Sequence, residues 1–237
     1  MNDAAGFAAY LSGFVAGLPE MSLESWLNEV GGPRKVAFLA VDLLRGFCKE
    51  GPLASERVAR VAAPTAALWT RAWALGCREF AHVMDHHNPQ AAEFEAFAPH
   101  CRVGTSEAEE VAEITGLPFA DHVHRFHKNS TSSWFGTDPF LKWLSVLDRG
   151  GVKAFIVSGD CTDLCVYQLA VPLKLRANAD NRPIEVIVPV DTVETYDLPV
   201  AKAAELGILP HPGDLLHQVF LYHMSLNGVR LIKRFVA

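Results

Sequence analysis

Hydrophobic positions along this chain form short continuous runs that alternate with segments of helical spacing. Six segments predict strands, some apolar throughout and others with polar residues interspersed, at 36–41, 79–84, 123–126, 153–158, 184–190 and 229–233. Helical spacing occupies four longer segments, at about 55–75, 138–147, 164–177 and 215–226. Strands that are apolar throughout are typical of a parallel sheet with helices on both faces. The pattern predicts an α/β fold, a three-layer α/β/α sandwich around a six-stranded, mainly parallel sheet.

Two segments depart from this alternation. Residues 1–32 have helical character and end at Gly31-Gly32-Pro33, so we interpret them as an N-terminal helical extension of a domain at 33–237. The connection over 86–118 contains little periodic structure apart from a short helix expected at 106–115. Connections of this length are more often functional than idle. Pro64 is expected to kink or break the first long helix.

Composition and charge exclude several classes of protein. The 237 residues suffice for one substantial core, and half of them are hydrophobic. The net charge of −6, without a cluster of Lys or Arg, argues against nucleic acid as a partner. No uncharged apolar run is long enough to predict a membrane span. Five cysteines without framework spacing, and no basic segment ahead of the apolar N-terminus, predict a reducing, cytoplasmic location.

Candidate chemistry gathers where predicted strands end. Asp42 follows the first strand, Lys128 the third, and Cys165 lies where the fourth strand leads into a helix. A helix N-terminus and a nearby ammonium both favour a thiolate, and a carboxylate can accept the thiol proton. Taken singly, each residue has an ordinary alternative: a helix cap, a solvated charge and a packing thiol.

Three motifs make the chain resemble the isochorismatase-like cysteine hydrolases over about residues 36–233. They are VDLLRGF at 41–47, Lys128 followed by SSWFGT at 132–137, and GDCTDLCV at 159–166. The resemblance implies Asp42 as proton acceptor, Lys128 as thiolate stabiliser and Cys165 as the nucleophile that attacks an amide carbonyl. It also implies a cis peptide between Asp160 and Cys161, with the backbone N–H groups of Cys161 and Cys165 binding the oxyanion. The implied strand order is 3-2-1-4-5-6.

A second group of residues indicates a metal. Asp85, His87 and His100 offer one carboxylate and two imidazoles, which suit Zn²⁺, Fe²⁺ or Mn²⁺. From spacing alone, solvated loop histidines remain an alternative, and His86 competes with His87 as a ligand. The segments DHHNP at 85–89 and FAPHC at 97–101 resemble those of the nicotinamidase branch. That resemblance implies a divalent metal, zinc first, that binds the pyridine nitrogen of a small amide substrate.

Departures from the nicotinamidase pattern leave the substrate open. His86 stands where the family has Trp, Asn88 is inserted, and the SWFGT segment leans toward carbamoyl- and ureido-amidohydrolases. Asp160 replaces a small or apolar residue. Aromatic residues near the motifs are expected to sandwich a flat ring, unless they belong to the core: Phe47, Trp134 and Phe135.

Three functions follow as hypotheses. The first is hydrolysis of nicotinamide to nicotinate and ammonia through a thioester. The second is metal-independent hydrolysis of a ureido, carbamoyl or other small amide, and the third is an inactive scaffold used for binding. Because residues 1–32 exceed the usual family core, we expect them to pack on a neighbouring subunit of a homo-oligomer or to cover the cleft.

Overall fold

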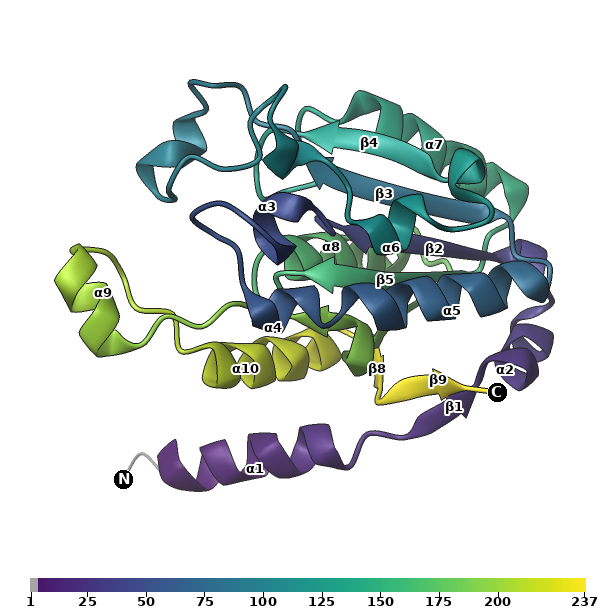
Figure 1. Ribbon diagram of the computed structural model, residues 1–237. Coiled ribbons are helices and arrows are strands. Elements are labelled where there is room, and N and C mark those ends of the chain that lie inside the picture. Colours follow the sequence, from purple (N-terminus) through teal and green to yellow (C-terminus); the bar gives the residue numbers. More distant parts are fainter. Residues whose placement is uncertain (1–3) are drawn as a thin grey trace.

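The computed structural model describes residues 4–237, and a mainly parallel sheet runs through its centre (Figure 1). The sheet has seven strands, of which six follow the order β4-β3-β2-β5-β6-β8. The seventh, β7, pairs with β5. In chain order these strands are β2 (Val36–Val41), β3 (Glu79–Asp85), β4 (His124–Lys128), β5 (Ala154–Asp160), β6 (Glu185–Pro189), β7 (Val193–Glu194) and β8 (Arg230–Ile232).

The six predicted strands all form, and their predicted order 3-2-1-4-5-6 is confirmed. Each pairing along this order is parallel. The carboxyl ends therefore lie along one edge, the side on which α3 (Arg45–Cys48), α4 (Glu56–Ala59) and α9 (Val200–Leu206) are seen in Figure 1. This edge is where ligands bind in open α/β sheets.

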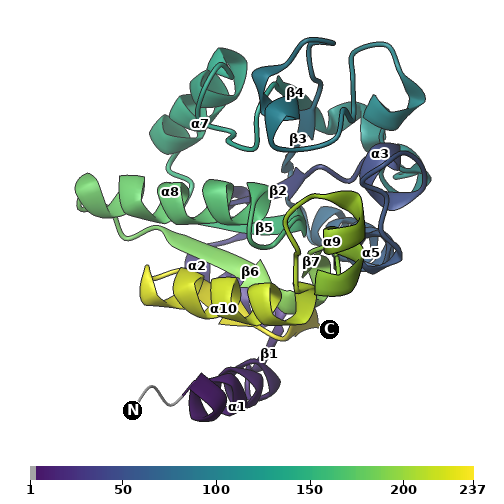
Figure 2. The ribbon, with the colours of Figure 1, turned by 90° about the vertical axis from the view of Figure 1, so that its left-hand side faces the viewer.

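Helices cover both faces of the sheet, as predicted. On one side α5 (Ala62–Ala74) packs Trp69 against Phe38 and Phe80 of the strands. On the other side lie α7 (Asp138–Gly150), α8 (Cys165–Ala179) and α10 (Gly213–Leu226), as Figure 2 shows. The remaining helices are short or peripheral, α1 (Ala4–Ala16), α2 (Leu23–Val30) and α6 (Ala112–Thr115).

Several short elements differ from the sequence prediction. Within the N-terminal extension, β1 (Glu20–Ser22) pairs in parallel with β9 (Arg234–Val236), so the two ends of the chain form a small second sheet. The expected break in the first long helix lies at residues 60–61, between α4 and α5, and not at Pro64. Pro64 stands in the first turn of α5, where its missing N–H has no intrahelical partner to lose.

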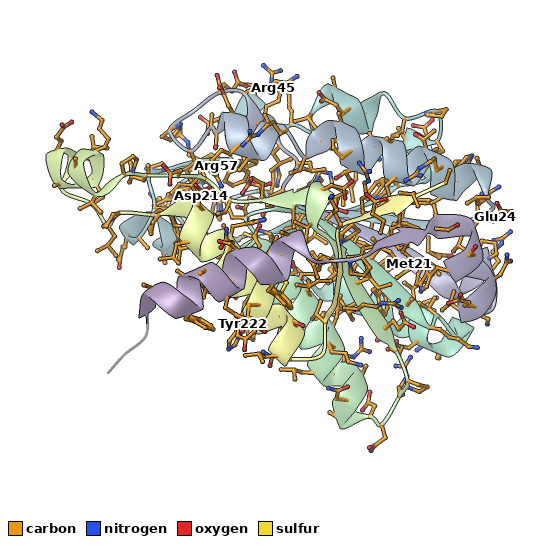
Figure 3. The ribbon with its side chains drawn as sticks, turned by 90° about the horizontal axis from the view of Figure 1, so that it is seen from below. Met21, Glu24, Arg45, Arg57, Asp214 and Tyr222 are labelled. Atoms are coloured by element: carbon orange, nitrogen blue, oxygen red, sulfur yellow. The ribbon has the colours of Figure 1, made fainter. Side chains whose placement is uncertain are left out.

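The N-terminal extension packs on its own chain. Helix α1 lies along α10, where Ser12 Oγ donates to Gln218 Oε1 at 3.0 Å, and Phe7 and Phe14 meet the ring of Tyr222 edge-on (Figure 3). No residue from 4–32 lines the cavity at the carboxyl edge, so the described part of the extension does not cover the cleft. Packing on a neighbouring subunit stays a prediction. Among the helices of residues 4–237, none is both long and apolar enough to cross a membrane.

Candidate active site

Four adjacent strands deliver four reactive side chains to one place. Asp42 directly follows β2, Asp85 ends β3, Lys128 ends β4, and Cys165 begins α8 after β5. Asp85 and Lys128 are partners in the pairing of β3 with β4. Parallel pairing therefore brings residues far apart in the sequence to one edge, as their positions after predicted strands had indicated.

Lys128 is the centre of the site. Its side chain is 1% exposed, and its Nζ lies 2.8 Å from Asp42 Oδ2 and 3.5 Å from Cys165 Sγ. The same ammonium also contacts Asp85 Oδ1. A buried lysine is stable only when it is paired, and here two carboxylates share one ammonium. The three predicted catalytic residues are thus together, with Asp85 as a fourth member.

Hydrogen bonds from neighbouring residues fix the backbone around Asp42, and two of these residues, His82 and Glu110, were not among the predicted site residues. Asp42 has a φ of 57°, which is uncommon for a residue with a side chain. Asp42 Oδ1 accepts the Asp85 N–H at 2.7 Å, and His82 Nε2 accepts the N–H of Leu43 at 3.1 Å. His82 Nδ1 lies 2.8 Å from a Glu110 carboxylate oxygen. These contacts fix the carboxylate that faces Lys128.

Burial controls the proton equilibria. It raises the pKa of Cys165, against the opposing effect of Lys128, so the resting thiol keeps its proton. Burial and the charge of Asp85 raise the pKa of Asp42, which makes Asp42 a stronger base than an exposed carboxylate. Although burial opposes its charge, Asp42 and Asp85 raise the pKa of Lys128 further, so the ammonium persists. The arrangement suits transfer of the thiol proton to Asp42.

The turn that carries the nucleophile has the predicted backbone. The peptide between Asp160 and Cys161 is cis. Gly159, just before it, has a φ of +114°, and a Cβ there would lie 2.0 Å from the Val41 carbonyl oxygen. Only glycine therefore allows β5 to pass this close to β2. Cys161 and Cys165, whose N–H groups are the predicted oxyanion donors, both line the cavity.

The predicted metal-binding residues also come together. Asp85 Oδ2 lies 3.3 Å from His87 Nε2 and 3.5 Å from His100 Nε2. Burial opposes the charge of Asp85, but Lys128 and the two imidazoles outweigh it and lower the Asp85 pKa. The neighbouring His86 instead places its ring 4.0 Å from that of His127. Of the two adjacent histidines, His87 is the one that faces Asp85.

Glu93 joins this group, although sequence reasoning did not include it. Ligand atoms of Asp85, His87, Glu93 and His100 all lie within 4.8 Å of one another. The Thr131 N–H donates to Glu93 Oε2 at 2.8 Å, which directs Oε1 to a point 3.9 Å from His87 Nε2. One signal in the sequence could have indicated Glu93: it is an acidic residue in the connection between the two predicted ligands His87 and His100.

These side chains fit a divalent metal. His87 Nε2 and Glu93 Oε1 are buried and have no hydrogen-bond partner among residues 4–237. His100 Nδ1 pairs with the Ala98 carbonyl oxygen at 2.8 Å, which leaves the Nε2 lone pair facing Asp85. Two imidazole nitrogens and two carboxylates are ligands that Zn²⁺, Fe²⁺ and Mn²⁺ accept. The donor chemistry therefore agrees with the predicted metal set, extended by one carboxylate.

One cavity joins the nucleophile to the metal group, and it contains about 430 Å³ of empty space including its open mouth. Phe47 lines it, as predicted. Trp134 and Phe135 do not: Trp134 packs edge-on against Phe140, and Phe135 is 74% exposed. The structure therefore brings only one of the three predicted ring contacts to the site. Two other aromatic residues line the cavity: Phe97, which begins the FAPHC motif, and Tyr196, which lies outside the recognised motifs.

The nucleophile motif also positions the Tyr196 wall. Asp163 Oδ2 lies 2.8 Å from His211 Nε2, and Asp163 Oδ1 accepts the Thr195 hydroxyl at 2.5 Å. The His211 ring stacks on Tyr196 with centroids 3.7 Å apart. Arg57 adds a further link, since it donates to the Thr195 carbonyl and pairs with Asp214 at 2.7 Å (Figure 3). This loop is therefore held against the cavity.

Comparison with known families agrees with this geometry. The model of the isochorismatase domain matches residues 36–207, which is most of the chain. The chain belongs to the isochorismatase family. Among curated proteins, Nicotinamidase 1 of Arabidopsis thaliana is 28% identical over 221 residues, which span 84% of this chain and 86% of that protein.

Solved structures share the fold. The nicotinamidase PncA from Bacillus subtilis superposes with a TM-score of 0.64 and 21% identity, over 84% of this chain and 99% of that one. The N-carbamoylsarcosine amidase from Thermoplasma acidophilum gives a TM-score of 0.61 and 20% identity, over 84% and 96%. A pyrazinamidase of Pyrococcus horikoshii in complex with zinc gives 0.62 and 21%, over 84% and 99%. The names of these relatives have one class of enzyme in common, the amidohydrolases.

Proposed function

We propose that this member of the isochorismatase family is a cysteine-dependent amidase that converts nicotinamide to nicotinate and ammonia. The observation that carries the proposal is the position of Lys128, whose ammonium contacts both the Asp42–Cys165 pair and the metal-group carboxylate Asp85. A nucleophile and a ligand set that share one cavity suit a substrate with a reactive amide at one end and a metal-binding nitrogen at the other. The 28% identity to a plant nicotinamidase supports the same substrate.

The proposed reaction begins with proton transfer from the Cys165 thiol to Asp42, while Lys128 stabilises the thiolate. The sulfur attacks the amide carbon, and the resulting oxyanion accepts hydrogen bonds from the N–H groups of Cys161 and Cys165. The carbon–nitrogen bond then breaks, and the leaving nitrogen takes the proton from Asp42 and departs as ammonia. A water gives a proton to Asp42 and attacks the thioester carbon. The carbon–sulfur bond breaks, the proton on Asp42 returns to the sulfur of Cys165, and the acid product leaves as nicotinate when its own proton passes to solvent or to ammonia.

Four side chains would hold the metal: Asp85, His87, Glu93 and His100. When bound, the metal supplies a Lewis acid that binds the pyridine nitrogen. Phe47 and Phe97 lie on the cavity wall, where they provide apolar surface for a flat ring. The substrate is then held by its ring while its amide faces Cys165.

The direct test is ammonia release from nicotinamide by the metal-loaded protein. We expect steady release by the wild type and none above background from Cys165→Ala. The control is Cys77→Ala, because Cys77 is equally buried but lies beyond the end of α5, outside the cavity lining. Release that continues in Cys165→Ala would contradict the covalent mechanism.

A different pattern would favour the second hypothesis. If nicotinamide is inert but an N-carbamoyl amide releases ammonia with the metal removed, the enzyme keeps its nucleophile and the substrate proposal is wrong. If neither amide is hydrolysed, with or without the metal, the binding-scaffold hypothesis gains instead.

A further inference from the structure

A carboxyl group that the proposed mechanism does not use lies in the cavity wall. Asp160 ends β5 directly before Cys161, and its side chain is 1% exposed. The Cys161 thiol donates to Asp160 Oδ2 at 3.9 Å, a long and weak contact. Asp160 Oδ1 is buried and has no hydrogen-bond partner in the described part of the chain. Asp160 is thus a residue of the cavity lining whose carboxyl has one unpaired oxygen.

The residues around the cavity offer no hydrogen-bond partner to Asp160 Oδ1 within the described part of the chain. The cavity that Asp160 lines also has apolar walls, from Phe47, Leu53, Val58 and Leu164. A buried polar atom without a partner destabilises the protein, and a polar side chain in an apolar wall calls for a compensating contact. The ammonium of Lys128 is already shared between Asp42 and Asp85. A bound substrate is the partner that the cavity can admit.

The electrostatic setting defines what such a partner must offer. Burial and the charge of Asp42 raise the pKa of Asp160 well above its usual range, against the opposing effect of Lys128, and this shift favours the neutral form of the carboxyl. A neutral carboxyl both donates and accepts a hydrogen bond. Its best partner is a small uncharged group with the same capacity, such as a hydroxyl or an amino group.

We propose that Asp160 is a specificity-determining residue, which selects among ring carboxamides for one with a hydroxyl or amino substituent that hydrogen-bonds to Asp160 Oδ1. This inference rests on the proposed amidase function and narrows its substrate class. Unsubstituted nicotinamide would present only a carbon–hydrogen edge to this wall and would leave Oδ1 unpaired. Sites built to hydrogen-bond a substrate discriminate strongly against analogues that lack the group.

The test compares nearly isosteric substrates. Amino- and methyl-nicotinamides, substituted at each free ring position (2, 4, 5 and 6), are assayed with the metal-loaded enzyme for kcat/KM. For one ring position we expect the kcat/KM of the wild type to be about tenfold or more higher for the amino compound than for the methyl compound. If the methyl compound is equal or better at every position, the inference is wrong.

Two variants locate the effect at Asp160. Asp160→Leu has a similar shape but no polar atom, and we expect it to reverse the amino-over-methyl preference. Asp160→Asn keeps hydrogen-bonding capacity, and we expect it to keep the preference. An unchanged ratio in Asp160→Leu would overturn the assignment. Should that variant not fold, the ratios of the wild type and of Asp160→Asn still decide the question.

Failure of this inference is distinct from failure of the proposed function. A wild type that releases ammonia from nicotinamide without any amino-over-methyl preference keeps the function and overturns the role of Asp160. A wild type that acts on none of these carboxamides overturns both.

Discussion

The two sides of Lys128 are built in different ways. On the nucleophile side, Asp42 directly follows β2 and Cys165 begins the helix after β5, and these two strands pair with each other. On the metal side, only Asp85 belongs to a strand, and the other ligands come from the long connection after β3: His87, Glu93 and His100. The proposed reacting groups thus follow the strands of the sheet, and most of the groups that would place the substrate stand on a loop.

This difference separates two tasks within one cavity. Precise geometry at the reacting atoms needs elements that do not move, which strand ends supply. Loops tolerate substitution and insertion, so substrate choice can change there without disturbing the nucleophile. Asp85 joins the two sides, since one of its oxygens contacts Lys128 and the other faces the imidazoles.

Removal of the shared cation should affect both sides and have the largest effect. In Lys128→Met, the carboxylates of Asp42 and Asp85 lose their common partner in a buried site. We expect no detectable turnover and a loss of about 3–5 kcal/mol in the free energy of unfolding. Urea unfolding measures the second quantity. Lys142→Met on the exposed face of α7 is the matched control, with an expected change below about 0.5 kcal/mol. Equal stability of the two variants would contradict the central role of Lys128.

A change on the metal side alone should weaken metal binding and spare the nucleophile. Glu93→Gln removes one charge from the ligand group, and we expect the metal affinity to fall by about 10–100-fold. Competition with a chelator measures this affinity, and alkylation of Cys165 by iodoacetamide should be unchanged. Glu95→Gln, an exposed residue in the same turn, is the control. If both variants bind metal equally well, Glu93 is not a ligand.

The smallest expected effect concerns the loop that carries Tyr196. Burial opposes the charge of Asp163, but hydrogen bonds from His211 and Thr195 prevail and lower its pKa in the folded protein. Asp163 therefore contributes stability above its unfolded pKa of about 3.9, and this contribution is lost as the pH falls further.

Asp163→Asn should consequently lower the Tm at pH 7, and the difference from wild type should shrink below about pH 4. The variant should also raise KM by a few fold, because the wall at Tyr196 is less firmly held. Thermal unfolding between pH 3 and pH 7 checks the first effect. A Tm difference that is constant over this range would refute the ionic contribution of Asp163.

Much of the fold could be predicted from the sequence because most of its main strands are largely apolar. The small elements could not. Strands β1, β7 and β9 contain two or three residues each, and their pairing depends on tertiary neighbours. Helix α9 buries only Ala203, so it has no apolar stripe to detect. Strand β4 extends to Lys128 despite its polar residues, because Met84 and Asp85 of β3 pair with them.

The site divides along the same lines. The residues at strand ends belong to contiguous motifs, and Asp42, Lys128 and Cys165 were predicted together. Glu93 and Tyr196 reach the cavity through distant contacts, with Thr131 and His211, that no local pattern contains. The sequence of a motif does not show which way an aromatic side chain points. Phe135, which was predicted to contact the substrate ring, is exposed to solvent.

The most direct test of the division between the two sides measures bound metal and ammonia release on the same two variants. The account predicts a crossed result. Cys165→Ala should keep the metal content of the wild type and release no ammonia from nicotinamide. His100→Ala should lose metal and keep the wild-type rate of Cys165 alkylation, with residual release at a raised KM. Ammonia release by Cys165→Ala, or full metal content in His100→Ala, would contradict the account.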